Sequence, residues 1–124
     1  MKTIFITGAT SGIGKATAIL LAKQKNRLIL CGRNKTILEE LKTELSKETE
    51  VFTLRFDVRN SDEVFAAINS LPEEWKNIDV LINNAGNAHG LDPISEGNID
   101  DWNSMMDGNV KGLLYVSQPI IKLM

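Results

Sequence analysis

The stretch Thr7-Gly8-Ala9-Thr10-Ser11-Gly12-Ile13-Gly14 separates a β-branched and aromatic run at residues 3–7 from a segment with helical apolar spacing. The run predicts a buried strand that stops at the first glycine. The helix is predicted to end near Asn26, and its periodic positions are Ile13, Thr17, Leu20, Leu21 and Gln24. A glycine-rich turn at this junction indicates a phosphate-binding site, because free N–H groups and the positive end of the helix dipole meet there.

Each glycine of this turn has a distinct expected role. Gly8 permits a turn that no side chain would allow, Gly12 lets the backbone approach a pyrophosphate, and Gly14 lets the helix pack close to the sheet. The spacing G-x-x-x-G-x-G differs from the commoner G-x-G-x-x-G, and taken alone it also suits a merely tight loop. The strand before it, the helix after it and the hydroxyls of Thr10 and Ser11 favour a dinucleotide site.

The rest of the chain continues the alternation of strands and helices. Apolar runs predict strands at residues 27–31, 51–56 and 78–82. Asn34 and Asn60 are expected to cap the second and third helices, and a polar loop over residues 83–98 precedes the last helix. The order β-α-β-α-β-α-β-α predicts an α/β fold with a doubly wound, Rossmann-like parallel sheet in the strand order 3-2-1-4.

We expect residues 1–124 to be the N-terminal part of a single NAD(P)-binding Rossmann domain whose remainder is absent. The last helix runs into the apolar end Ile120-Ile121-Lys122-Leu123-Met124 without a capping glycine. The strand at residues 78–82 would also leave an apolar sheet edge uncovered, which a self-standing domain rarely does.

Composition excludes several classes of protein. The 124 residues are 43% apolar and carry 14 basic against 16 acidic side chains, which suits a folded domain and gives no surplus positive charge for nucleic acid. No apolar run approaches a membrane span, and no signal peptide is visible, so we expect a cytoplasmic protein. The single Cys31 and single His89 can form neither an internal disulfide nor a Cys/His zinc site.

Three further motifs lie beyond the glycine turn: Asp57-Val58, Asn83-Asn84-Ala85-Gly86, and Asn109 within the last helix. With these motifs the whole chain resembles the short-chain dehydrogenase/reductase family. Residues 71–79 and 90–93 are similar to its NADP-dependent 3-hydroxy acid (serine or allo-threonine) dehydrogenase branch. The resemblance implies that Asp57 and Val58 line an adenine pocket, and that Asn109 holds a water of the proton relay and interrupts its helix.

The residues and the resemblance together define the candidate cofactor site. Arg33 follows the second strand, where a fold that prefers NAD carries an acid, so its guanidinium favours a 2′-phosphate and hence NADP; alternatively, it is a solvated residue that begins a helix. The candidate cofactor-binding residues are Gly8, Thr10, Ser11, Gly12, Ile13, Gly14, Arg33, Asn34, Asp57, Val58, Asn84, Ala85 and Gly86.

The last helix has an apolar stripe in which Asn109 is the one strongly polar residue, so we expect a buried amide with local partners. Pro119 is expected to bend or end this helix. Leu114 and Ile121 lie off the stripe, and a helix that is apolar on more than one face needs a second cover. With the family resemblance, this predicts a homo-oligomer formed through the last helix.

The catalytic residues of the family are a Tyr followed four residues later by a Lys, with a Ser upstream. Here the only tyrosine, Tyr115, is followed four residues later by Pro119 and belongs to the last helix. We therefore expect the chain to be inactive alone. Three functions remain open: the cofactor-binding half of an NADP-dependent oxidoreductase for a small hydroxy or keto substrate such as a 3-hydroxy acid, a non-catalytic dinucleotide-binding module, and a 3-oxoacyl-type reductase.

Overall fold

The computed structural model describes residues 1–86 and 92–124. At its centre is a parallel sheet of four strands, β1 (Thr3–Ile6), β2 (Arg27–Gly32), β3 (Val51–Arg55) and β4 (Val80–Ile82), in the order β3-β2-β1-β4. Ile4 of β1 pairs with Leu28 on one side and Val80 on the other. The predicted parallel sheet and its strand order are confirmed.

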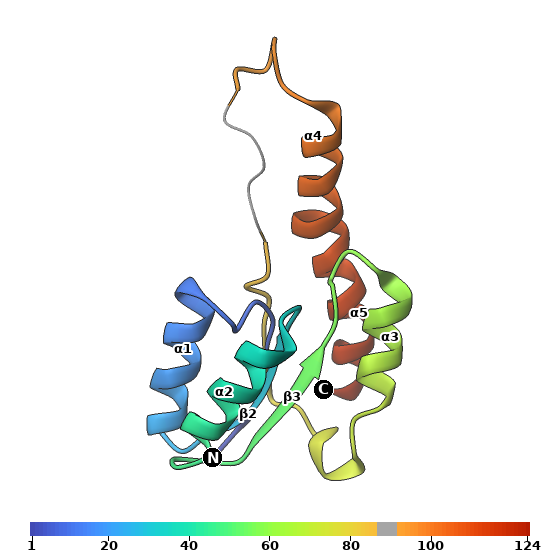
Figure 1. The fold of residues 1–124 in the computed structure, drawn as a ribbon. Coiled ribbons are helices and arrows are strands. Elements are labelled where there is room, and N and C mark those ends of the chain that lie inside the picture. Colours follow the sequence, from blue (N-terminus) through green and yellow to red (C-terminus); the bar gives the residue numbers. More distant parts are fainter. Residues whose placement is uncertain (87–91) are drawn as a thin grey trace.

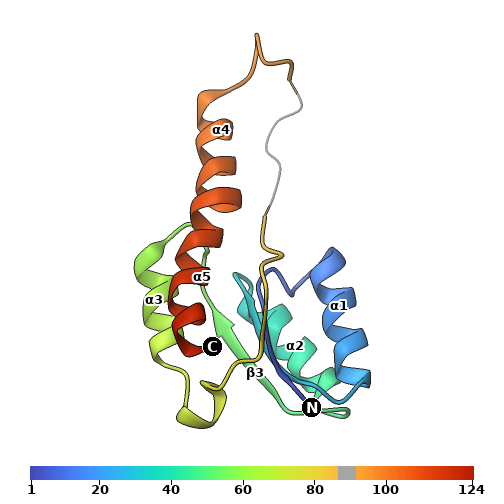
Figure 2. The same ribbon diagram turned by 180° about the vertical axis from the view of Figure 1, so that it is seen from behind.

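Helices cover both faces of this sheet (Figures 1 and 2). α1 (Gly12–Lys23) and α2 (Lys35–Leu45) lie on one face, and α3 (Ser61–Asn69) and α5 (Gly112–Leu123) lie on the other. Alternate residues of β1 therefore enter different cores: Ile4 and Ile6 pack with α1 and α2, whereas Phe5 packs with α3 and α5. Burial on both faces explains why β1 and β2 are almost wholly apolar.

Asparagine side chains begin three of the helices. The Oδ1 of Asn34 accepts the backbone N–H of Ile37 at 3.1 Å, and the Oδ1 of Asn60 accepts that of Glu63 at 3.1 Å, which confirms both predicted caps. Asn98 accepts the N–H of Asp100 at the start of α4 (Ile99–Met106). These caps set where each helix begins, and hence where the loops above the sheet end.

β4 is shorter and less buried than expected. It covers Val80–Ile82 rather than residues 78–82, and all three of its residues are half-buried. The N–H of Ile78 bonds to the carbonyl oxygen of Lys76, so this residue closes a turn before the strand begins. In the described chain β4 pairs only with β1, and its second edge therefore has no strand beside it.

α4, a π-helical segment (Asp107–Lys111) and α5 form one continuous rod (Figure 1). The π-helical segment contains Asn109, as the resemblance implied. The rod continues through Pro119 to Leu123, so the expectation that Pro119 could end the helix is wrong.

Two expectations for burial along this rod are also corrected. Asn109 is exposed rather than buried. The apolar stripe is buried only at Val116 and Ile120 of α5, because α5 packs against α3 whereas α4 extends beyond the sheet and has no buried residue (Figure 2). Within residues 1–86 and 92–124, no helix has both the length and the apolarity needed to cross a bilayer.

Candidate functional site

A cavity of about 610 Å³ lies at the carboxyl ends of the four strands. Ligands of doubly wound sheets bind at this edge, because the loops that follow the strands converge there. The cavity is bordered by the turn after β1, the ends of β2 and β3, the segment after β4 and Gly108 of the π-helical segment. All the candidate cofactor residues of the sequence line it except Gly14 and Asn34.

The three glycines of the first turn differ in their surroundings. Gly8 has φ +64° and Gly12 has φ +56°, conformations that favour glycine. A Cβ on Gly12 would meet no atom within 4 Å, so the space above this peptide is open to a ligand. A Cβ on Gly14 would instead overlap the carbonyl oxygen of Gly8 and the side-chain amide of Asn84, so Gly14 serves close packing.

At the N-terminus of α1, hydrogen-bond donors point away from the helix without a side-chain acceptor from the N-cap residue. Ser11 precedes the helix with extended backbone, and its hydroxyl makes no capping bond. The first turn contains no acidic side chain, and Ile13 is 79% exposed. The helix N–H groups and the Ser11 hydroxyl thus remain available to an anion at the cavity wall.

Thr7 connects the turn after β1 to the segment after β4, a role that sequence reasoning missed. Its buried hydroxyl oxygen accepts the N–H of Asn84 at 3.0 Å and the N–H of Ala85 at 2.9 Å. The Asn84 side-chain amide in turn donates to the carbonyl oxygen of Gly8 at 3.0 Å. The only sequence signal was a hydroxyl residue at the end of an apolar strand. These bonds hold two walls of the cavity at a fixed separation.

Arg33 is distinct among the four arginines of the chain. Arg27, Arg55 and Arg59 form ion pairs with Glu50, Glu63 and Asp57 respectively. Arg33 has no ion pair with a carboxylate in the described part of the chain, and it borders both the main cavity and an adjoining one of about 490 Å³. The carboxylate charge that acts on Arg33 is that of Asp57, which is itself paired with Arg59, so a guanidinium without a direct ion pair stands at the end of β2.

The adjoining cavity is lined by Thr10, Arg33, Asn34 and Lys35. The Asn34 oxygen caps α2, so its side-chain N–H groups are the part that can still donate to a ligand. Two cations, one amide and one hydroxyl thus converge at the edge of the main cavity.

Asp57, at the end of β3, is held by Arg59, which sequence reasoning did not single out. The carboxylate accepts the Arg59 backbone N–H at 3.0 Å, its Nε at 3.1 Å and its Nη2 at 2.7 Å. These hydrogen bonds, opposed by partial burial, lower the pKa of Asp57 from its usual value. The signal in the sequence was an arginine two residues after the acid. Asp57 is therefore an oriented, ionised acceptor on the cavity wall.

The π-helical segment brings Asn109 to the segment after β4. A Cβ on Gly86 would lie 2.6 Å from the Asn109 Oδ1, so a larger residue there would displace the Asn109 side chain from this position. Asn83 donates from Nδ2 to the Ser117 hydroxyl at 2.9 Å, which joins the same segment to α5. Tyr115 instead packs edge-to-face with Phe65, with ring centroids 6.4 Å apart, and does not line the cavity.

The described residues provide neither an acid/base pair nor a metal site here. The described lining of the cavity contains no tyrosine, lysine or histidine. No group of three potential metal ligands occurs within residues 1–86 and 92–124, and His89 lies outside them. Cys31 lines the cavity but is fully buried, and this burial raises the pKa of its thiol well above the ordinary value. The described cavity therefore offers hydrogen-bonding groups but no tyrosine, lysine or histidine that could exchange a proton with a substrate.

Comparison with known proteins shows which chains share this arrangement. The family model for short chain dehydrogenases matches residues 2–124. The NADP-dependent 3-hydroxy acid dehydrogenase of Schizosaccharomyces pombe is 44% identical over 125 residues, 98% of this chain and 48% of that protein. The enzyme of the same name, YdfG, of Escherichia coli O6:H1 is 39% identical over 118 residues, 95% of this chain and 47% of that protein.

A solved structure of serine dehydrogenase in its closed form, complexed with NADP⁺, matches with a TM-score of 0.90 and 38% identity. The match covers 98% of this chain and 48% of that one. The chain thus spans about half the length of the curated relatives it matches.

Proposed function

The chain belongs to the short-chain dehydrogenase family, and from this premise we propose that it is the NADP-binding part of an oxidoreductase. The substrate class we propose is a small hydroxy or keto compound, most specifically a 3-hydroxy acid, as in the names of the relatives. The observation that carries the proposal is Arg33, an arginine without a direct ion pair in the described chain, beside a cavity whose other walls suit a dinucleotide.

Each part of NADP has a matching group in this proposal. The pyrophosphate would be held by the N-terminus of α1 at Ser11, Gly12 and Ile13, where the space above Gly12 is open. Asp57 would accept from the adenine amino group, and Arg33 with Asn34 would hold the 2′-phosphate. The residues present therefore fit the cofactor.

Thr10, Val58, Ala85 and Gly86 would complete the walls of the site, while Gly14 and Asn84 would support the turn after β1. Bound NADP would supply or accept a hydride.

Acid/base chemistry needs a part of the family fold that the described cavity lacks. We propose that residues 1–124 are the N-terminal part of a single Rossmann domain, in which Asn109 supports the proton relay beside Gly86. The Ser and the Tyr-x-x-x-Lys of the family would come from the remainder of that domain. A proton must reach the substrate oxygen as charge develops on it, so residues 1–124 alone would bind NADP without turning substrate over.

One observation favours a second candidate, a non-catalytic dinucleotide-binding module: no tyrosine or lysine lines the described cavity. A coding sequence that continues past Met124 into a Ser and a Tyr-x-x-x-Lys would support the enzyme. A stop codon directly after Met124 would support the module. A reductase of 3-oxoacyl chains would share the whole cofactor site, so only activity on each substrate class separates it from a 3-hydroxy acid dehydrogenase.

The proposed cofactor preference is tested by calorimetry of NADP and NAD binding to the wild type and to Arg33→Ala. Loss of a charge-assisted, bidentate contact is expected to weaken NADP binding by about 1.5–3 kcal/mol, or roughly tenfold or more, and to leave NAD binding little changed. Lys25→Ala is the control, because it removes an exposed cation at the opposite end of the sheet. An unchanged preference for NADP in Arg33→Ala would overturn the assignment.

We also propose that the rod formed by α4 and α5 is covered by a second copy of the chain. Seven large apolar side chains on it are exposed: Ile99, Trp102, Met106, Val110, Leu113, Leu114 and Ile121. Monomers rarely expose a large contiguous apolar patch, so this many exposed apolar side chains on one rod favour a second copy as its cover. Light scattering at micromolar concentration tests this proposal, and a stable, soluble monomer of 13.7 kDa would contradict it.

A further inference from the structure

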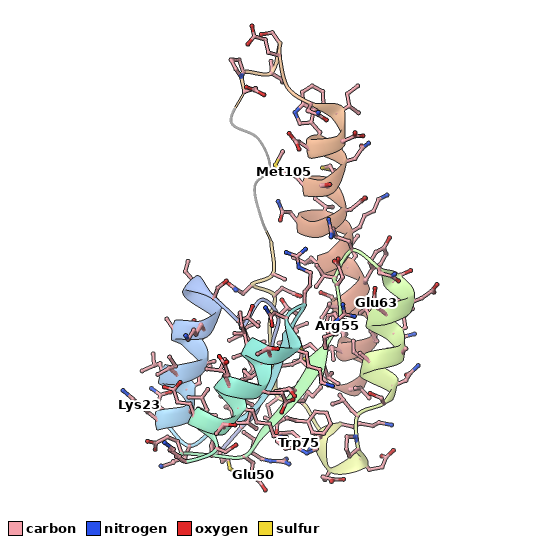
Figure 3. All side chains as sticks on the ribbon, viewed as in Figure 1. Lys23, Glu50, Arg55, Glu63, Trp75 and Met105 are labelled. Atoms are coloured by element: carbon pink, nitrogen blue, oxygen red, sulfur yellow. The ribbon has the colours of Figure 1, made fainter. Side chains whose placement is uncertain are left out.

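Arg55 and Glu63 lie close together beside the cofactor cavity, at the end of β3 and the start of α3 (Figure 3). Arg55 is the last residue of β3 and lies opposite Gly32, the last residue of β2. Its Nε donates to the carbonyl oxygen of Arg33 at 3.2 Å, and its Nη1 donates to Glu63 of α3 at 3.1 Å. One guanidinium therefore connects the turn after β2 to the first turn of α3.

The turn that carries Arg33 is consequently held from two sides. Arg55 holds the carbonyl group of Arg33, and the next residue, Asn34, caps α2 by accepting the Ile37 N–H. With the peptide between Arg33 and Asn34 fixed at both ends, the direction in which the Arg33 side chain leaves the backbone is restricted. A backbone that is already held loses less conformational freedom when the side chain it carries binds a ligand.

Glu63 determines which of the two arginines can bind an anion. It neutralises Arg55, whereas Arg33 forms no direct ion pair with a carboxylate among the described residues. Two guanidinium groups thus lie near the end of β2 with different tasks: Arg55 already has an anionic partner, and Arg33 is free to contact a ligand. Arg55 itself does not line the main cavity.

The ion pair between Arg55 and Glu63 contributes little to the stability of the fold. The side chains of Arg55 and Glu63 are 55% and 37% exposed, and ion pairs exposed to that degree contribute little to folding. A variant of Arg55 is therefore expected to fold, which allows its role in binding to be measured.

We propose that Arg55 is a positioning residue for the ribose 2′-phosphate: its hydrogen bond to the Arg33 carbonyl group presents the Arg33 guanidinium to that phosphate. This inference rests on the proposed binding of NADP. It assigns part of the discrimination between NADP and NAD to a residue that does not touch the cofactor.

The test is calorimetry of NADP, NAD and adenosine 2′,5′-bisphosphate with the wild type, Arg55→Ala and Arg55→Lys. Loss of one hydrogen bond is expected to weaken binding of NADP and of the bisphosphate about fivefold in Arg55→Ala, with NAD binding changed less than about twofold. Arg55→Lys keeps the charge and a donor but lacks the fork that reaches the Arg33 carbonyl oxygen and Glu63 together, so its loss is expected to be smaller than that of Arg55→Ala. Lys25→Ala, which removes another exposed ion pair, is expected to bind as the wild type does.

Two outcomes would overturn the inference alone. Equal weakening of NADP and NAD in Arg55→Ala would show a general structural effect, and wild-type binding by Arg55→Ala would show that the hydrogen bond is not used. A wild type without any preference for NADP, or an Arg33→Ala variant that keeps it, would instead overturn the proposed function, and this inference with it.

Discussion

The turn at residues 7–14 and α4 at residues 99–106 both lie beyond the carboxyl edge of the sheet, yet they are held very differently. In the turn, the hydroxyl of Thr7 accepts two backbone N–H groups and Gly14 is closed in by Gly8 and Asn84. α4 has no buried residue, and Trp102 and Met106 on it are exposed. The turn is built from contacts within the described chain, whereas α4 presents apolar surface that these contacts leave uncovered.

The ordered turn suits ligand binding, whereas the exposed side chains of α4 suit contact with another chain. A site that holds a dinucleotide needs backbone groups placed in advance, and the contacts around the turn provide that order before a ligand arrives. The exposed side chains of α4 contribute little to folding of the described chain, because burial is what makes an apolar side chain stabilising. Substitutions in the turn should therefore lower the free energy of unfolding much more than substitutions in α4.

The largest effect is expected for Gly14→Ala in the turn. The added methyl group would overlap the carbonyl oxygen of Gly8, a backbone atom with little freedom to move, so a loss of about 3 kcal/mol in the free energy of unfolding is expected from urea denaturation. Gly12→Ala is the matched control, with open space around its methyl group and only the strain of its positive φ, about 1 kcal/mol. Equal stability of the two variants would contradict the packing assigned to Gly14.

Thr7→Val is expected to cost about 2 kcal/mol, because the N–H groups of Asn84 and Ala85 would lose their acceptor. Thr53→Val, which removes an exposed hydroxyl bonded to Glu39, should change stability by less than about 0.5 kcal/mol. Thermal or urea unfolding of both variants measures this difference. If Thr7→Val unfolds like the wild type, the hydroxyl does not hold the two loops together.

A smaller effect concerns pH. Because Arg59 lowers the pKa of Asp57 in the folded chain, the pair stabilises the fold above the ordinary aspartate pKa of 3.8, and this contribution is lost as the pH falls through the lowered value. For a partly exposed pair we expect less than about 1 kcal/mol. The free energies of unfolding of wild type and Asp57→Asn, measured from pH 7 to pH 3, should differ by a constant amount above about pH 4 and approach each other as the pH falls further toward the lowered pKa. A constant difference across this range would show that ionisation of Asp57 is not involved.

The smallest effect is expected in α4. Met106→Lys replaces a side chain that is 54% exposed and should change the stability of the monomer by less than about 0.5 kcal/mol. In the same rod, Val116→Ala removes buried atoms and should cost about 2 kcal/mol. Urea denaturation of dilute samples measures the free energy of unfolding of both variants. A large loss for Met106→Lys under dilute conditions would show that α4 packs against the domain after all.

The order of elements was predictable because it depends on near neighbours in sequence. Apolar runs located β1 to β3 to within a residue or two, and Asn34 and Asn60 begin α2 and α3 as their side chains suggested. A cap contacts a backbone group only a few residues away, so its effect can be read without knowledge of the fold. The glycine turn was predictable for the same reason.

The partners of the site residues were less predictable, because they come from distant parts of the chain. Thr7 bonds to backbone groups 77 and 78 residues away, and Arg55 reaches a carbonyl group 22 residues away. Contacts between residues so far apart in sequence leave no periodic pattern of residue types from which they could be predicted. Asn109 was expected to be buried because it lies on an apolar stripe, and the structure leaves it exposed beside Gly86.

By itself, the sequence determined the family, the alternation of strands and helices, and which residues gather at the carboxyl edge of the sheet. Only the tertiary structure decided that Arg33 forms no direct ion pair in the described chain while Arg59 holds Asp57, and that α5 is packed while α4 is not. The physical reason is that backbone propensities and caps act over a few residues. Ion pairing and burial depend on which distant segments the sheet brings together.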